Sequence, residues 1–172
     1  MINFRGAWDR LKAVLSTTKK QVDDSLKEAS REEIDKVADK IRSGLVTQNP
    51  GGQGILRSIS IMNMDLRRRR GIAGDLALIS HGELFDSIGV YEKDGVYVAG
   101  VLPGTTRRQQ NPGFSMASLA EIQENGAVLH SGLGVIVVPP RPFIRPVYQE
   151  YLRNPKGAVD TFLGKIKKVL GL

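Results

Sequence analysis

Few side chains in this sequence are of the types that catalyse reactions. His81 and His130 stand far apart, and neither lies in a metal-binding spacing such as HExxH. His81 with Glu83 and Asp86 forms a group able to perform acid–base catalysis, although polar side chains are also expected there for helix capping. The chain has no cysteine, which excludes disulfides, thiolate metal sites and cysteine nucleophiles. We therefore expect no enzymatic activity, catalytic residue, metal or cofactor, with a hydrolase around His81 as an alternative.

Arginine is the residue type whose arrangement indicates an interaction. The candidates form an unbroken run and a pair within a polar segment: Arg67, Arg68, Arg69 and Arg70, and Arg107 and Arg108. A guanidinium binds phosphate oxygens bidentately, so these residues are candidates for contact with DNA. The run lacks the interleaved aromatic residues on which single-strand binders stack bases. The alternative is a solvated helix face at a subunit boundary.

The formal net charge of +7 is concentrated toward the end of the chain. Residues 131–172 contain seven basic and two acidic side chains, and therefore carry +5 of that charge. Such an excess favours a polyanionic partner, with a solvated surface as the alternative. The longest apolar run, Gly134–Val138, is too short to span a bilayer, and the first residues mix charged with apolar side chains. We expect a soluble protein made in the cytoplasm.

The length of 172 residues suits a single domain, placed here over residues 1–172. Apolar residues at helical spacing predict one or two long amphipathic helices over residues 1–48, ended by the Pro/Gly-rich segment 47–54. Ser30 and Glu33 fit a capping box, which is where a second helix would begin. A further short helix is expected around residues 63–70. Residues 155–172 predict a last amphipathic helix, whose apolar stripe we expect to pack on protein rather than on a membrane.

The residues between these helices, 55–152, are expected to form the core. Alternating apolar residues over 86–102, with Asp94-Gly95 at their centre, predict a β-hairpin. A polar, exposed loop is expected over 103–114. Ser115 is expected to cap a helix that ends at Asn125-Gly126, and one or two short strands follow. The predicted fold class is α+β, with a small antiparallel sheet covered by long amphipathic helices.

One stretch, VVPPRPFIRP at Val137–Pro146, ends a β-branched run abruptly. Proline lacks a backbone donor and fixes φ, so this stretch is neither a helix interior nor a central strand. It predicts a joint between a strand and a helix, made by Pro139, Pro140, Arg141, Pro142, Phe143 and Arg145. We expect Phe143 to be buried and the two arginines to reach carbonyl oxygens or acids. A plain joint without a function at an interface is the alternative for either arginine.

Three segments in the same order resemble one protein family. SHGELFDSIGVYEKDGVYVAGV (Ser80–Val101), LAEIQENG (Leu119–Gly126) and PPRPFIRPVYQE (Pro139–Glu150) resemble motifs of the neck and tail-completion proteins of tailed phages, a head–tail joining and virion-morphogenesis family. The Arg-rich segment before Ser80 resembles the family as well. The resemblance covers about residues 63–152, and RPFIRP is its most specific part.

The resemblance implies a structural virion protein that forms a homo-oligomeric ring at the neck, through which DNA passes. In such a ring, Arg67–Arg70, Arg107 and Arg108 would face the lumen or a subunit interface. Six-fold symmetry is expected, and twelve-fold symmetry is the alternative. Expected partners are the head connector or adaptor and the tail tube or tail terminator, with transient contact to genome DNA and no membrane. Two other functions stay open, namely a tail terminator ring and a nucleic-acid-binding module that uses Arg67–Arg70.

Overall fold

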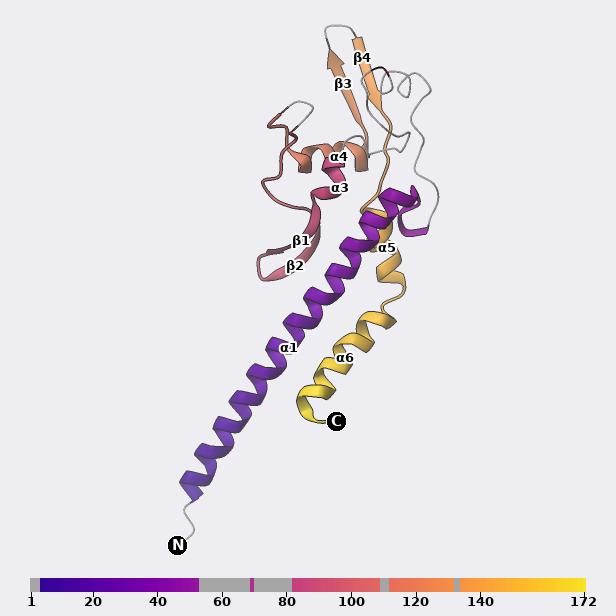
Figure 1. Ribbon diagram of the computed structural model, residues 1–172. Helices are drawn as coiled ribbons and strands as arrows, with labels where there is room; N and C mark the ends of the chain where they lie inside the picture. Colours follow the sequence, from indigo (N-terminus) through magenta and orange to yellow (C-terminus); the bar gives the residue numbers. More distant parts are fainter. Residues whose placement is uncertain (1–3, 53–68, 70–81, 109–111, 132–133) are drawn as a thin grey trace. The chain divides into compact units, whose positions relative to one another are not determined.

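The computed structural model of the protein describes residues 4–52, 69, 82–108, 112–131 and 134–172. Within them, helices and antiparallel strands form an α+β fold, as the sequence predicts (Figure 1). The elements in chain order are α1 (Phe4–Thr47), η1 (Pro50–Gly52), α3 (Glu83–Asp86), β1 (Ile88–Lys93), β2 (Val96–Val101), α4 (Met116–Asn125), β3 (Ala127–Ser131), β4 (Gly134–Val138), α5 (Arg145–Arg153) and α6 (Lys156–Leu170).

The chain groups into two compact units, although a single domain is expected from its length. The first unit contains Met1–Glu33 and Pro155–Leu172, and the second contains Ile34–Asn154. The boundary falls inside α1 and at Pro155, where α5 has ended. Proline after a helix end prevents the helix from continuing, as expected for Asn154-Pro155. All segments that resemble phage neck proteins belong to the second unit.

The N-terminal residues form one helix of 44 residues, not two. Ser30 does not cap a new helix, because its hydroxyl donates to the carbonyl oxygen of Leu26 at 2.8 Å inside the continuous helix. Ser16 and Thr17 bond in the same way to the carbonyl oxygen of Ala13, both at 2.9 Å. Serine and threonine hydroxyls make this backward bond within helices. The capping-box prediction at Ser30 and Glu33 is therefore wrong.

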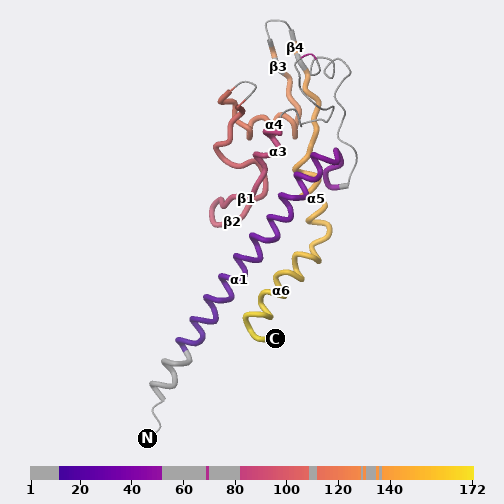
Figure 2. The backbone as a smooth tube through the Cα atoms, in the orientation of Figure 1, coloured from indigo at the N-terminus to yellow at the C-terminus, as the bar shows by residue number. Residues whose placement is uncertain are grey.

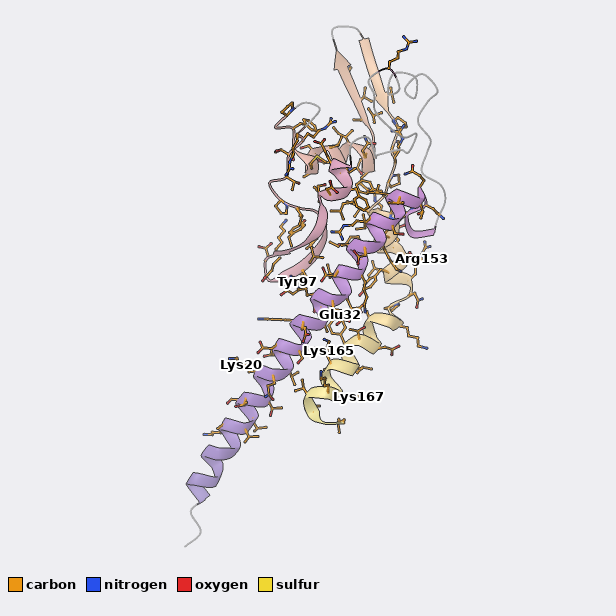
Figure 3. The ribbon with its side chains drawn as sticks, viewed as in Figure 1. Lys20, Glu32, Tyr97, Arg153, Lys165 and Lys167 are labelled. Carbon is orange, nitrogen blue, oxygen red and sulfur yellow. The ribbon has the colours of Figure 1, made fainter. Side chains whose placement is uncertain are left out.

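In the first unit, α6 runs antiparallel to α1. Thr161 donates its hydroxyl to Glu33 Oε1 at 2.6 Å, and Lys165 Nζ lies 3.0 Å from Glu28 Oε1. Lys165 Nζ also lies 3.3 Å from Glu32 Oε2, and Figure 3 labels these two residues. The hydrogen bond to Glu28 is the main cause that raises the pKa of Lys165. Polar contacts therefore hold this helix pair in register, while Val159, Leu163 and Leu170 of α6 stay about half exposed.

The hairpin β1–β2 has the predicted two-residue turn. Lys93 pairs with Val96, and Asp94 and Gly95 between them have φ values of 53° and 78°. Two consecutive positive φ values define the type I′ turn, which matches the twist of a hairpin and favours Asp-Gly. The hairpin is tied to α1 because Arg42 donates from Nε (3.2 Å) and Nη2 (2.5 Å) to the carbonyl oxygen of Ile88.

The core of the second unit lies between this hairpin and the helices around it. It takes side chains from α1, α3, β1, β2, α4, α5 and the segment before α5: Val37, Ala38, Ile41, Leu45, Leu84, Ile88, Ala99, Met116, Ala120, Phe143 and Val147. These side chains are almost completely removed from water, and burial of apolar surface is the main stabilising contribution to folding. Helices thus cover the small sheet, in agreement with the predicted fold class.

The second hairpin, β3–β4, extends from α4 on the side away from β1–β2 (Figures 1 and 2). It begins at Gly126, whose φ is 73°. A Cβ at this position would lie 2.8 Å from the carbonyl oxygen of Val138, so glycine is required on both counts. The predicted helix end at Asn125-Gly126 is therefore confirmed. Ser115 also caps α4 as predicted, accepting from the Ser118 N–H at 3.4 Å.

Candidate functional site

The joint between β4 and α5 is the site that the sequence singles out most specifically. β4 ends at Val138, Pro139 and Pro140 follow, and α5 begins at Arg145. Phe143 is completely buried, as predicted, and belongs to the core together with Val147 of the following helix. The prolines therefore turn the chain out of the hairpin, and Phe143 fixes the start of α5 on the core.

The joint is held by two consecutive residues near the end of α4, Gln123 and Glu124. The carbonyl oxygen of Gln123 accepts from the Arg141 N–H at 2.6 Å. Glu124 Oε1 accepts from the N–H groups of Phe143 at 2.6 Å and Ile144 at 2.5 Å. The two segments that carry the family resemblance, LAEIQENG and PPRPFIRPVYQE, thus form one structure.

Glu124 supplies the cap that α5 lacks locally. Ile144 at the N-cap position makes no side-chain capping bond of its own, and the first N–H groups of a helix have no partner within the helix. A carboxylate is well suited to this place because it accepts hydrogen bonds and opposes the positive end of the helix dipole. The residue pattern does not reveal this role of Glu124, since its N–H partners lie 19 and 20 positions later.

The arginine at the joint has the kind of partner that the sequence predicts. Arg145 donates from Nη2 to the side-chain carbonyl oxygen of Asn125 at 2.8 Å, and its own side chain stays exposed. This confirms that Arg145 reaches a carbonyl oxygen. The joint therefore combines a buried aromatic ring, Phe143, with an exposed arginine, Arg145.

A hollow lies between β2, α4 and α5, next to the joint. It has a volume of about 490 Å³, and its apolar lining includes Ala99, Gly100, Ala117, Ala120 and Ile144. The rest of the lining includes larger side chains, among them Tyr91, Val98 and Val101.

Tyr148 of α5 closes one side of this hollow. Its hydroxyl bonds to both backbone groups of Ala99, and burial raises the pKa of Tyr148. The residue pattern gives no sign of this role, because the partners of Tyr148 are backbone groups 49 positions earlier in the sequence.

The arginine pair lies in a loop that is tied down at its base. Thr106 bridges to Ser115, and Arg107 exchanges backbone hydrogen bonds with Phe114 (2.8 Å) and Gly113 (3.1 Å). The described part of the loop predicted over 103–114 therefore has an ordered base.

Glu83 links this loop to α3 and separates the roles of the two arginines. Glu83 Oε1 accepts from the Arg108 N–H at 2.7 Å, and Glu83 Oε2 lies 3.7 Å from Arg107 Nε. The Arg107 side chain is only 15% exposed, whereas Arg108 is exposed. Arg108 is consequently the member of the pair that is available to a polyanion.

The other candidate residues are only partly described. Arg69 is exposed, and Arg67, Arg68, Arg70 and the short helix predicted around 63–70 otherwise lie outside the described residues. His81 also lies outside them, while His130 is exposed on β3. Glu83 holds the Arg107–Arg108 segment, and Asp86 is exposed at the end of α3.

Two further properties concern the described part of the chain alone. None of its helices combines the length and apolar character needed to cross a membrane. Within the same residues, histidine, aspartate and glutamate do not gather in groups of three or more that could hold a metal ion.

Comparison of the chain with protein-family models, with curated proteins and with solved structures found no match.

Proposed function

We propose that this protein is a structural component of the neck of a tailed phage or prophage-derived particle, acting in tail completion or head–tail joining. In this role it forms a homo-oligomeric ring, six-fold or alternatively twelve-fold, between the head connector or adaptor and the tail tube or tail terminator. DNA passes through the ring and makes transient contacts. The protein resides in the virion, at the head–tail interface.

The observation that carries this proposal is the joint between β4 and α5. The two motif segments that resemble the family, Leu119–Gly126 and Pro139–Glu150, pack together through Glu124 and Phe143. A resemblance spread over distant segments has more weight when those segments make one compact structure. The joint also leaves Arg145 exposed beside an apolar hollow, as suits a protein that works through contacts with other chains.

Arg108 and Arg69 are the described candidates for contact with DNA in the ring. A channel for DNA must not repel phosphate and must not hold it tightly, and a few solvated arginines satisfy both conditions because each contact is weak and screened by salt. Arg107 contributes less in this role, since its guanidinium lies mostly buried beside Glu83.

Mass measurement in solution, combined with DNA binding across a salt series, tests the function. A ring of six or twelve copies without tight DNA binding at physiological salt is the expected result. A monomer that binds DNA with a steep salt dependence would contradict the proposal and favour the nucleic-acid-binding alternative. A ring that joins tails but never heads would favour the tail terminator.

A complementation assay for infectious yield tests the channel. Arg108→Glu is expected to reduce the yield of completed, DNA-filled particles while circular dichroism stays unchanged. Lys93→Glu, an equal charge change at an exposed position of the β1–β2 hairpin, is the matched control. Equal yields from the two variants would remove Arg108 from the channel.

A further inference from the structure

The first unit holds α6 with very little buried surface. Among residues 12–33 and 155–172, the part of this unit whose side chains the structure describes, only Ala29 and Glu33 of α1 are buried. No side chain of α6 is buried, and Ala29 does not belong to the apolar core of the second unit. Burial of apolar surface is the main stabilising contribution to folding, so the docking of α6 adds little stability compared with that core.

The contacts between α6 and α1 include polar groups that lie at the surface. Lys165 Nζ pairs with Glu28 and Glu32, whose side chains are 68% and 46% exposed. Exposed ion pairs add little to stability, because water and salt screen them. The hydroxyl of Thr161 reaches further in, since it donates to the buried carboxylate of Glu33. The helix α6 is therefore held in place without an interlocking apolar core.

The hydrogen bonding of the backbone is interrupted between α5 and α6. The bonds of α5 end at the N–H of Asn154, which donates to the carbonyl oxygens of Glu150 and Tyr151. The bonds of α6 begin where the N–H of Val159 donates to the carbonyl oxygen of Pro155. Proline has no N–H that could continue the pattern of α5. A change of backbone angles at Asn154 can therefore move α6 while α5 keeps its hydrogen bonds.

We propose that α6 is a strap that opens from α1 as one piece while the second unit stays folded. Proteins open locally, at free energies below that of global unfolding, where buried apolar contacts are few, and α6 meets this condition. Opening exposes the stripe of α1 around Ala29 and Glu33 and leaves the core around Phe143 in place. The inference does not depend on the proposed function.

Two alanines of α1 provide a matched pair of positions for thiol labelling, because the chain has no cysteine of its own. Ala29 and Ala38 are 0% and 1% exposed. Ala29 lies one turn before Glu33, which α6 contacts, whereas Ala38 belongs to the core of the second unit. The variants Ala29→Cys and Ala38→Cys are treated with the thiol reagent DTNB under native conditions. Each rate is divided by the rate of the same variant unfolded in urea, which corrects for intrinsic reactivity.

The thiol of Ala29→Cys is expected to react at least about tenfold faster than that of Ala38→Cys, because it requires only the opening of α6. Its rate is expected to change little in low urea, since little surface is exposed on opening, whereas the rate of Ala38→Cys rises steeply. Thr161→Val removes the hydrogen bond to Glu33 at nearly constant side-chain size, so it is expected to accelerate the reaction of Ala29→Cys alone. Circular dichroism confirms that each variant is folded.

Equal corrected rates with the same urea dependence would overturn the inference, because α6 would then leave only in global unfolding. A rate for Ala29→Cys as fast as in the unfolded chain would also overturn it, since α6 would not close on α1 at all. A fast rate that Thr161→Val leaves unchanged would indicate fraying of α1 instead. If a cysteine variant does not fold, amide hydrogen exchange of the unsubstituted chain decides: α6 is expected to exchange faster than α5, and equal protection of the two helices would contradict the strap.

Discussion

The hydroxyl of Tyr148 donates to the carbonyl oxygen of Ala99 at 2.7 Å and accepts from the N–H of the same residue at 3.0 Å. A side chain of α5 thereby provides a hydrogen-bond partner for both the N–H and the carbonyl oxygen of Ala99 in β2. Tyr148 thus occupies, at one residue, the place of a third strand. It stabilises the open edge of the hairpin and fixes α5 beside it.

Tyr148→Phe is expected to lower the free energy of unfolding by about 1–3 kcal/mol, because both backbone groups of Ala99 lose their partner. Denaturant unfolding followed by circular dichroism measures the change. Tyr97→Phe, on the same strand, is the matched control and is expected to have a smaller effect. Equal stability of the two variants would show that the Ala99 bonds contribute nothing.

The same tyrosine predicts a loss of stability at alkaline pH. Burial raises the pKa of Tyr148 above its ordinary value, so the folded state holds the phenolic proton more tightly than the unfolded state. The resulting stabilisation is complete below the unfolded pKa of about 10 and is lost as the pH rises through the folded pKa. Unfolding midpoints at pH 8 and at about pH 11 are expected to differ more in the wild type than in Tyr148→Phe.

Lys165 also has a raised pKa, but this contribution is common to both proteins and cancels in the comparison. A pH dependence identical in the two proteins would contradict the role assigned to Tyr148.

Glu124→Ala is expected to destabilise the protein by about 1–3 kcal/mol, since two N–H groups at the start of α5 lose a charged acceptor. Glu124→Gln keeps an acceptor oxygen without the charge, so its loss is expected to be smaller. Glu121→Ala, on the same helix but exposed, serves as the control. Chemical denaturation is expected to show the largest loss of unfolding free energy for Glu124→Ala, a smaller loss for Glu124→Gln and the smallest for Glu121→Ala. Equal losses in the three variants would argue against capping of α5 by Glu124.

Phe143→Ala is expected to cost about 3–5 kcal/mol, because it removes a completely buried aromatic ring and leaves a cavity in the core. Phe143→Leu keeps most of the apolar volume and is expected to cost less. Thermal or chemical unfolding of the purified variants provides the measurement. An unchanged melting temperature in Phe143→Ala would mean that the joint does not contribute to the core.

Lys165→Met is expected to loosen α6 from α1, because Lys165 is the cation between Glu28 and Glu32. The effect is expected to be small and to disappear at high salt, since the pair is exposed to solvent. Faster amide hydrogen exchange in α6 at low salt is the readout. Lys167→Met, on the exposed face of the same helix (Figure 3), is the control and is expected to leave exchange unchanged.

Sequence reasoning succeeds here wherever a structure depends on neighbouring residues. Asp94-Gly95 specifies its turn because the required φ values are properties of those two residues, and Ser115 and Gly126 delimit α4 for similar local reasons. Phe143 was predicted to be buried because prolines around it prevent regular structure while an apolar helical pattern follows.

The remaining features depend on residues far apart in the sequence. Glu124 and Tyr148 act on backbone groups 19 to 49 positions away, and backbone groups leave no trace in a residue pattern. The capping prediction at Ser30 was wrong because a serine hydroxyl can also bond to a carbonyl oxygen of the preceding turn inside a continuous helix. The partner of Arg107 was missed because Glu83 precedes it by the whole β1–β2 hairpin.

The β3–β4 hairpin (Ala127–Val138) lies between two segments that are hydrogen-bonded to each other. Gln123 and Glu124 hold the chain before it leaves, and Arg141, Phe143 and Ile144 are held where it returns, so both ends of the insertion are fixed independently of its length. Lengthening a loop between fixed ends costs little, since the entropy of closure grows only logarithmically. Residues added in pairs to β3 and β4 would therefore lengthen this hairpin without changing the packing of the core. The length of the β3–β4 hairpin can thus change at this one place while the rest of the chain stays the same.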